Sequence, residues 1–473
     1  LFLKWSNKEA FYLRHGSLYC GGALLVAYLL AFVQAVNIRG NIEAVMQVVV
    51  YLLLFLVLFD YYREHKEEIL STFFVPITAG GVLAAILGIA GYTHLFTGNY
   101  ATINSSRIHA TLQYANTAAV YFMLVALLLM AMILNGKRIW LKALLAGVGH
   151  VLLMALFFTS SRGVFLVFPP IVFLVLFFVM PAGARMRSFL TVLAMTIPMV
   201  VTMQTFNAVA QQKQTQSAFI WIFIGFVLSA LLMLGFDLLR KIPMSKPTQY
   251  CVLALSGIVI IIVGVLQGPL IIEVVKQFIL TNIPKNVLNR MQDINLETNS
   301  VVMRFEFYKE AWTLIQRQWW FGYGGGGFAS LYQSVQVLYY AAKLVHNHYL
   351  QIFVESGILG ILSFLGLILT AGASMFFGRL KQELLEHRVE AASLLCAFLA
   401  LSLHSVIDFN LSFTSMGYLL WGMIAIGAAY GVSSRKGEIP LWQPQAMYQW
   451  PMFALVTIVG LASVSFSLAG YQM

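Results

Sequence analysis

Thirteen long apolar stretches constrain this chain more than any other feature of its sequence. A helix needs about 20 mostly apolar residues to cross roughly 30 Å of hydrocarbon, and stretches of that length recur along the whole chain of 473 residues. They lie at 17–36, 44–60, 71–92, 113–134, 141–159, 163–181, 188–206, 218–239, 250–272, 350–377, 390–408, 411–432 and 451–470. The pattern predicts an all-α, polytopic integral membrane protein with about 12–13 transmembrane helices.

The composition excludes the classes of protein that fold in water. Hydrophobic residues make up 60% of the chain and charged residues only 10%, whereas about a quarter of a soluble domain is charged. A soluble enzyme and a disordered chain are therefore excluded. The three cysteines (Cys20, Cys251 and Cys396) all lie inside apolar runs, so they form neither a disulfide framework nor a metal-ligand spacing.

The formal net charge of +11 comes from Lys and Arg residues that are unevenly distributed between the two sides of a membrane. With a cytoplasmic N-terminus, 18 of the 29 Lys and Arg residues fall in the N-terminal segment and the cytoplasmic loops, as the positive-inside rule requires. Seven of the other 11 lie in one long outer segment, and four lie in short outer loops. The excess charge therefore sets the orientation in a lipid bilayer, and we expect no nucleic acid partner.

The spans divide the chain into three parts. Residues 1–272 are expected to form an N-terminal membrane bundle of nine spans, and residues 348–473 a C-terminal membrane bundle of four spans. Residues 273–347 form one long extracytoplasmic loop, in which amphipathic patterns at 273–292 and 302–318 predict two helices. A glycine-rich turn at 322–327 follows them, and a further helical stretch is expected before the next span.

Three arginines lie on the face where positive charge is disfavoured. Arg162 follows Ser161 in a tight hairpin, where a snorkelling arginine and a phosphate ligand are equally good interpretations. Arg107 lies in a loop rich in Asn, Ser and His, which an ordinary solvated loop explains equally well. Arg304 is flanked by aromatic and apolar residues; a salt bridge along its own helix is one interpretation, and partial burial beside an anionic partner is the other.

Two histidine motifs lie at the same face. His346 and Asn347 precede the tenth span, where a single histidine is often structural but could serve as the general base for a hydroxyl. His404 and Asp408 are spaced i, i+4 near the end of the eleventh span, and a helix-stabilising pair is the favoured interpretation over catalysis. No cluster of carboxylates suited to Mg²⁺ or Mn²⁺ is seen on the outer side, so the sequence predicts no metal and no cofactor.

The motif beginning at His346 resembles a known family signature. His346-Asn347, nine residues and then Gly357-Ile358-Leu359-Gly360 resemble the signature of the bacterial O-antigen ligase and polymerase superfamily. Three other segments occur in the order along the chain, and on the side of the membrane, that the signature implies. They are the segment from Arg304 to Trp312, the glycine-rich turn and the upstream Ser161-Arg162-Gly163 hairpin. The stretch from His404 to Asp408 also looks like a segment found in relatives. The resemblance covers about residues 100 to 415.

The resemblance implies a metal-independent, inverting membrane glycosyltransferase with no cofactor. Its donor would be a glycan on undecaprenyl diphosphate, and its acceptor a hydroxyl of a glycolipid, a glycan or a protein. His346 would be the base, and Arg162, Arg304 and, less firmly, Arg107 would bind the diphosphate. Asn347, Ser161, Gly357, Gly360, His404 and Asp408 would support them.

Location and exact activity follow from the same resemblance. It implies a multi-pass protein of the bacterial cytoplasmic (inner) membrane whose active site faces the periplasm or the cell exterior, with a role in polysaccharide and lipopolysaccharide biosynthesis. A chain polymerase or a protein O-oligosaccharyltransferase of the same superfamily remains open. A flippase for lipid-linked sugars is the alternative from another class, although a flippase needs a polar path through the membrane.

Overall fold

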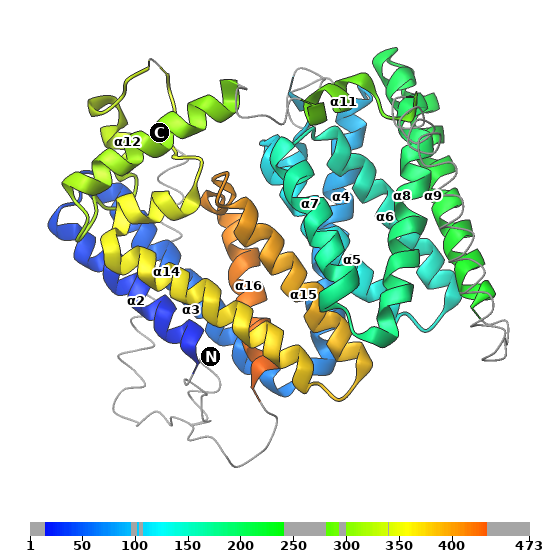
Figure 1. Ribbon diagram of the computed structural model, residues 1–473, viewed down its shortest axis with the longest axis horizontal. Helices are drawn as coiled ribbons and strands as arrows, with labels where there is room; N and C mark the ends of the chain where they lie inside the picture. Colours follow the sequence, from blue (N-terminus) through cyan, green and yellow to red (C-terminus); the bar gives the residue numbers. More distant parts are fainter. Residues whose placement is uncertain are drawn as a thin grey trace, which may run out of the picture. The chain divides into compact units, whose positions relative to one another are not determined.

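The computed structural model describes residues 15–95, 102–103, 107–240, 281–292, 299–338 and 340–432. Within these residues the chain is almost entirely helical, and only β1 (Thr102–Ile103) and β2 (Arg107–Ile108) pair as short antiparallel strands. The helices pack into two units, which are Leu1–Ile69 with Leu296–Met473, and Leu70–Asn295. Figure 1 shows the elements of each unit.

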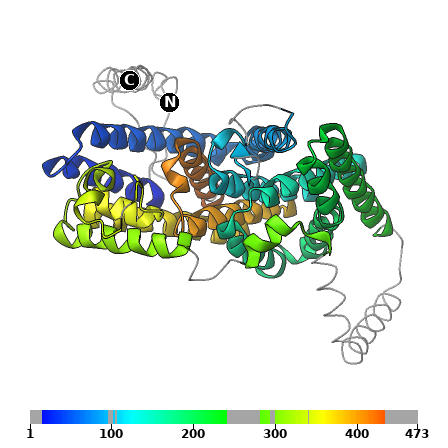
Figure 2. The same ribbon diagram turned by 90° about the horizontal axis from the view of Figure 1, so that it is seen from above.

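The first unit combines helices from both ends of the chain. They are α2 (Gly16–Leu30), α3 (Ile38–Glu64), α12 (Asn299–Arg317), α13 (Gly327–Leu331), α14 (His348–Lys381), α15 (Leu385–His404) and α16 (Thr414–Gly431). α14 packs against α2, α15 and α16, and Figure 2 shows α12 running beside α14. α3 begins six residues before the expected span because the Asn37 side chain caps it, accepting from Gly40 N at 2.9 Å.

The second unit is a bundle built from the middle of the chain. Its helices are α4 (Val75–Tyr92), α5 (Ala115–Asn135), α6 (Ile139–Phe158), α7 (Arg162–Leu174), α8 (Ala182–Gln211), α9 (Thr215–Leu239) and α11 (Lys285–Gln292). α5 lies at the centre, and most of its residues are buried. α7 contains Pro169 and Pro170 and passes into a π-helical segment, Val175–Val179, because proline removes hydrogen bonds from the regular helix.

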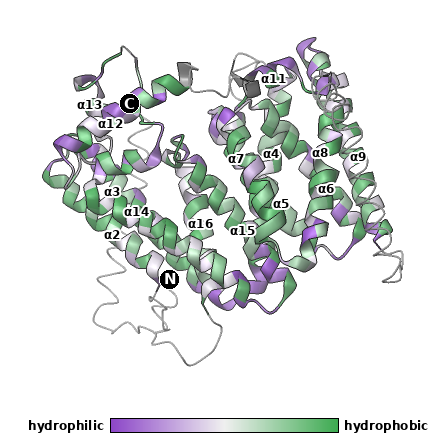
Figure 3. Ribbon diagram, viewed as in Figure 1, coloured by the Kyte–Doolittle hydropathy of each residue, from purple (hydrophilic) through white to green (hydrophobic). Residues whose placement is uncertain are grey.

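Nine helical segments in the described part of the chain are long and apolar enough to cross a membrane. They are Gly16–Val33, Ile38–Glu64, Lys66–Tyr92, Ala115–Asn135, Ile139–Phe158, Arg162–Val179, Ala182–Gln211, Thr215–Leu239 and His348–Lys381. Each overlaps one expected span, and Figure 3 shows these helices apolar over most of their length. The prediction of an all-α, polytopic membrane protein is confirmed.

Of the four other expected spans, two correspond to helices in the structure and two lie outside the described residues. α15 and α16 overlap the stretches expected at 390–408 and 411–432, but α15 ends at His404 and α16 begins at Thr414, and neither belongs to the nine segments. The spans expected at 250–272 and 451–470 lie outside the described residues.

The expected helices of the long loop are partly seen. α12 corresponds to the amphipathic helix expected at 302–318. α11 begins only at Lys285, after Pro284, and the residues from 273 to 280 lie outside the described part. After the glycine-rich turn the structure has the short α13 and a 3₁₀ turn (Tyr332–Ser334), rather than a helix that continues to the next span.

Loops that the charge pattern assigns to one side lie together within each unit. In the second unit, Thr215 Oγ1 donates to Thr93 O at 2.6 Å, which joins two loops assigned to the outer side. In the first unit, His348 N donates to Ser405 O at 2.9 Å at the end assigned to the outer side. At the end assigned to the cytoplasmic side, Lys66 Nζ donates to Val432 O at 3.1 Å. The alternation of the loops along the sequence therefore matches the packing of each bundle.

The glycine-rich segment Gly322–Gly327 packs into a break in α14. At Gly357 the backbone is left-handed, with φ 64° and ψ −162°, so the regular helix is interrupted. Three backbone hydrogen bonds cross the break: Tyr323 N to Val354 O at 2.9 Å, Gly324 N to Glu355 O at 2.8 Å, and Ile358 N to Trp319 O at 2.8 Å. The loop thereby satisfies backbone groups that the broken helix leaves without an internal partner.

Glu355 fixes the same loop from inside the bundle. Its Oε1 accepts from Gly326 N at 3.1 Å and from Gln351 Nε2 at 2.6 Å, and its Oε2 accepts from the Tyr28 hydroxyl at 2.9 Å. A carboxyl group that is partly buried in this way is tolerated because several donors converge on it. The Glu355 side chain therefore adds a contact to both the segment from 322 to 327 and α2, beside the backbone hydrogen bonds at the break.

Gly357→Ala tests whether the break in α14 depends on glycine. An alanine Cβ there would overlap the carbonyl oxygen of Trp320. The backbone conformation, φ 64° with ψ −162°, is essentially restricted to glycine and costs another residue about 1–3 kcal/mol even without that overlap. We expect a lower thermal unfolding temperature for the purified protein in detergent.

Gly372→Ala, on the same helix, is the matched control. Its Cβ would meet only Phe398 Cε1, at 3.6 Å, which is ordinary van der Waals contact. An alanine inside a regular helix is neutral or stabilises it by up to about 1 kcal/mol. Equal unfolding temperatures for the two variants would contradict a required break at Gly357.

Candidate functional site

His346 and Asn347 form the start of α14. Asn347 is the N-cap, and its Oδ1 accepts from Tyr349 N at 3.0 Å and from Leu350 N at 3.1 Å. His346 precedes it in a left-handed conformation, with φ 57°, which is uncommon for a residue with a side chain. Tyr308 of α12 donates its hydroxyl to the His346 carbonyl oxygen at 2.9 Å. The His346 backbone is thus fixed on both sides.

Asp408 brings Arg304 and His346 together. Arg304 Nη2 lies 3.0 Å from Asp408 Oδ2, and His346 Nδ1 lies 3.3 Å from Asp408 Oδ1. The Asp408 side chain is 1% exposed, whereas the side chains of Arg304 and His346 are each 21% exposed. One buried carboxylate therefore links α12, the start of α14 and the turn after α15.

The charge on Asp408 is stabilised by these neighbours. Burial alone would raise the pKa of Asp408, but the contact with His346 and the positive charge of Arg304 outweigh it and lower the pKa to about 2. Asp408 is therefore ionised at neutral pH. It contributes stability above about pH 4, and that contribution is lost as the pH falls toward 2.

The His346 ring is oriented by aromatic side chains as well as by Asp408. It stacks on Phe307 with a centroid distance of 5.5 Å and meets Phe409 edge-on at 4.5 Å. A carboxylate beside Nδ1 favours the tautomer whose proton is on Nδ1, which leaves Nε2 as the basic nitrogen. The arrangement therefore presents Nε2 as the ring nitrogen that could accept a proton from a substrate.

Tyr308 is a neutral donor in this site. Burial raises the pKa of Tyr308 to about 12, a shift that the nearby charge of Arg304 opposes. Its hydroxyl is therefore protonated at neutral pH and can donate to the backbone of His346.

The expected i, i+4 pair of His404 and Asp408 is wrong. α15 ends at His404, so Asp408 lies in the following turn rather than on the same helix. His404 Nδ1 instead lies 2.6 Å from Asn410 Nδ2, two residues beyond Asp408. His404 is therefore buried behind the turn that carries Asp408.

Arg304 has its carboxylate partner on a distant segment. The salt bridge expected with a residue at i+2 or i+4 of its own helix gives way to the pair with Asp408, because Arg304 points toward the turn after α15. A guanidinium has five N–H donors, and the side chain is partly exposed, so the pair with Asp408 leaves donors that could bind an anion.

Arg107, Ser161 and Arg162 lie near one turn of the second unit. Arg107 Nε donates to Thr159 O at 2.8 Å, and its Nη2 donates to Asn116 Oδ1 at 3.1 Å. Ser161 is the N-cap of α7, and Arg162 is the first residue of that helix. The structure thus holds Arg107 against the hairpin that carries Arg162, and two of its donors are used inside the protein.

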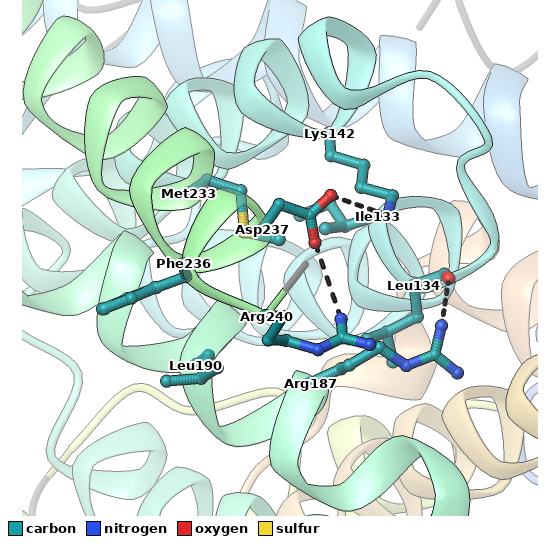
Figure 4. Close-up of a pocket in the computed structure, with 9 residues that line it drawn as sticks. All are labelled: Ile133, Leu134, Lys142, Arg187, Leu190, Met233, Phe236, Asp237 and Arg240. Atoms are coloured by element: carbon teal, nitrogen blue, oxygen red, sulfur yellow. Dashed lines mark hydrogen bonds and ion pairs between the residues drawn. The ribbon is translucent and has the colours of Figure 1, made fainter. Parts of the chain in front are cut away.

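A charged pocket lies at the other end of the second unit (Figure 4). Lys142 Nζ lies 2.9 Å from Asp237 Oδ2, and Arg240 Nη1 lies 3.5 Å from Asp237 Oδ1. Arg187 lines the same pocket and donates to Leu134 O at 3.4 Å. These residues come from loops that the charge pattern assigns to the cytoplasmic side, so we regard the pocket as structural.

The structure therefore groups the candidate residues by unit. Arg304, His346, Asn347 and Asp408 meet in the first unit, with His404 behind them, and Gly357 and Gly360 lie farther along α14. Arg107, Ser161 and Arg162 lie together in the second unit. Among the described residues, no group of three or more His, Cys, Asp or Glu could hold a metal ion.

The sequence reasoning missed three aromatic residues of the site, Phe307, Tyr308 and Phe409. Tyr308 lies one helical turn after Arg304, and Phe409 follows Asp408 directly. Spacing from those two residues is the only signal that could have identified them.

Arg304→Met tests the pair with Asp408. It leaves a buried carboxylate without its cation, which typically costs about 3 kcal/mol. We expect a clear fall in the thermal unfolding temperature in detergent, and partial recovery in the double variant with Asp408→Asn because that change removes the unpaired charge.

Lys309→Gln is the control on the same helix. Lys309 pairs with Glu306 at 2.7 Å, but its side chain is 71% exposed, and such pairs contribute at most about 1 kcal/mol. If the unfolding temperature fell no further in Arg304→Met than in Lys309→Gln, the pair of Arg304 with Asp408 would not be important for stability.

Comparison with known protein families finds a match over residues 213–365 to the family described as O-antigen ligase. This segment contains Arg304, His346, Asn347, Gly357 and Gly360 and ends within α14. The match confirms the resemblance indicated by the motif that begins at His346. A comparison with curated proteins finds no match.

Proposed function

We propose a specific reaction for this protein, supported by the match of residues 213–365 to the O-antigen ligase family. The protein transfers a glycan from undecaprenyl diphosphate to an acceptor hydroxyl on the extracytoplasmic face of the membrane. The observation that carries the proposal is the contact of Asp408 with both His346 and Arg304, because it joins a candidate base to a candidate anion ligand.

His346 is the general base of the proposed reaction. The acceptor oxygen forms a bond to the anomeric carbon while its proton passes to Nε2 of His346. The bond from the anomeric carbon to the diphosphate breaks, and its electron pair stays on the diphosphate oxygen. Asp408 stabilises the imidazolium that forms, as a carboxylate does in a catalytic triad. This single displacement inverts the configuration of the anomeric carbon.

Arginine side chains bind the leaving diphosphate. The departing lipid diphosphate gains negative charge, and guanidinium groups in a poorly hydrated site can offset that charge. In this proposal Arg304 contributes the N–H groups that Asp408 does not use. Arg162, the first residue of α7 in the second unit, is a separate candidate ligand for a diphosphate. Arg107 acts mainly by holding the hairpin of Arg162, which its bond to Thr159 O supports. The reaction then needs no metal.

The remaining residues have positioning roles. Asn347 caps α14 and sets the direction of the chain at His346. Gly357 and Gly360 allow α14 to break and pack closely, since a Cβ at Gly360 would overlap the Ser356 side chain. His404 supports the Asp408 turn through Asn410. Ser161 begins the α7 helix beside Arg162.

The proposed orientation follows from the charge pattern. Among the short loops, those that face the cytoplasm in this proposal carry most of the Lys and Arg residues, and the N-terminus lies on the same side. The start of α14 lies at the opposite end of the first unit, where His348 N bonds Ser405 O. A lipid-linked donor presented in the outer leaflet can reach His346 from that side.

His346→Ala tests the role of the base. We expect transfer by the purified full-length protein to fall by roughly 10²–10⁴-fold, the usual contribution of a general base. The unfolding temperature should fall less than in Arg304→Met, because Arg304 still pairs with Asp408. Asp408→Asn keeps the histidine but loses the carboxylate that selects its tautomer, so kcat should also fall while the donor KM changes less. The measurement is the initial rate of glycan transfer from a lipid diphosphate donor.

His65→Ala provides the histidine control, because His65 lies at the opposite end of the first unit, at the end of α3. It should keep the wild-type rate. Full activity of His346→Ala would rule out His346 as the base.

A further inference from the structure

The first unit contains a cavity of about 400 Å³ next to the start of α14. Its walls come from α2, α3, the glycine-rich segment with α13, α14, the turn after Asp408 and α16. This volume falls in the range of about 300–1,000 Å³ that is typical of small-ligand sites.

The cavity shares its wall with the candidate site. Lys343, Leu344 and His348, which line it, lie on either side of His346 in the sequence. Leu411 and Ser412, which also line it, follow Asp408 by three and four residues. A ligand in the cavity therefore lies against the same two short segments that carry the His346 and Asp408 pair.

The side chains of the wall suit an uncharged polyhydroxylated ligand. Asn37 and Gln47 bring amide groups to the wall, and the rings of Tyr51 and Trp421 stack with their centroids 5.8 Å apart. The amide of Gln351, which also lines the cavity, is bonded to Val345 N and to Glu355. Amide groups beside aromatic faces provide hydrogen bonds and apolar contact together. Sugars present hydroxyl groups and apolar C–H faces in this combination.

The charge of the wall argues against a diphosphate in the cavity. Among the described residues that line it, Lys343 is the one cation and no arginine is present, whereas Glu43 and Glu355 contribute carboxyl groups. An anionic ligand would gain little there, in contrast to the neighbourhood of Arg304. The cavity and the arginine site therefore suit different parts of a glycosyl substrate.

His348 provides a polar group that the fold leaves without a partner. Its Nδ1 is buried and makes no hydrogen bond to the described residues, and its ring meets Phe364, another lining residue, edge-on at 5.5 Å. A buried ring nitrogen without a partner is costly. Because His348 lines the cavity, a ligand hydroxyl that reached this nitrogen with a small movement of the ring would satisfy it.

We infer that this cavity binds a short neutral saccharide of one of the two substrates, with His348 as a polar contact. The inference rests on the proposed transfer reaction, in which both substrates carry sugars. The saccharide belongs either to the lipid-linked donor or to the acceptor, and separate binding measurements distinguish the two sources.

Ala329→Trp fills the cavity from α13, where Ala329 lines it. Ser330→Trp adds the same ring at the next, exposed residue of that helix, which does not line the cavity. His348→Ala removes the polar contact without adding bulk. Each full-length variant is purified in detergent and compared with wild type by its unfolding temperature.

Saturation-transfer NMR then measures binding of two probes. One probe is the saccharide released from the lipid-linked donor by mild acid, and the other is the saccharide of the acceptor. We expect wild type and Ser330→Trp to bind at least one probe, and Ala329→Trp and His348→Ala to bind it at least about tenfold more weakly. The probe that binds identifies the source.

Binding of neither probe to wild type, or equal binding by Ala329→Trp and wild type, would overturn the inference. His346→Ala separates this result from the proposed reaction. If His346→Ala keeps its transfer activity while the cavity variants lose saccharide binding, the role of the base fails and the saccharide site stands. If His346→Ala is inactive and the cavity variants bind normally, the saccharide site fails and the reaction stands.

Discussion

The buried carboxylate of Asp408 is the interaction on which the first unit depends most. A charge that is 1% exposed is tolerated only when cations or donors surround it, and here Arg304 and His346 fill that role. The requirement fixes where α12 lies against the start of α14. It also orients the imidazole that the proposed reaction uses, so stability and chemistry depend on the same group.

The break in α14 connects this site to the cavity beside it. The glycine-rich segment inserts its backbone at Gly357, and Glu355 holds that segment against α2. The same segment forms one wall of the cavity, while His346 lies at the start of the helix. A regular α14 without the break would remove the hydrogen bonds that shape this wall, which explains the need for glycine at 357.

The sequence predicts the helices well because an apolar run of about 20 residues is long enough to span a bilayer and is rare in proteins that fold in water. It also predicts Arg304 and His346 as candidates through their motifs. It does not predict their meeting with Asp408, since Arg304 and Asp408 are 104 residues apart and their contact depends on tertiary packing. Nor does it predict the end of α15: Val406 and Ile407 extend the apolar run, but Ser405 O accepts from His348 N and the chain turns there.

The configuration of the product at the anomeric carbon tests the central claim most directly. Transfer by the purified full-length protein would be run in excess EDTA with a lipid diphosphate donor of known anomeric configuration, and the product read by NMR. A single displacement with His346 as base and arginines as the diphosphate ligands predicts an inverted product formed at an undiminished rate. A retained configuration, or a rate that EDTA abolishes and added metal restores, would contradict it.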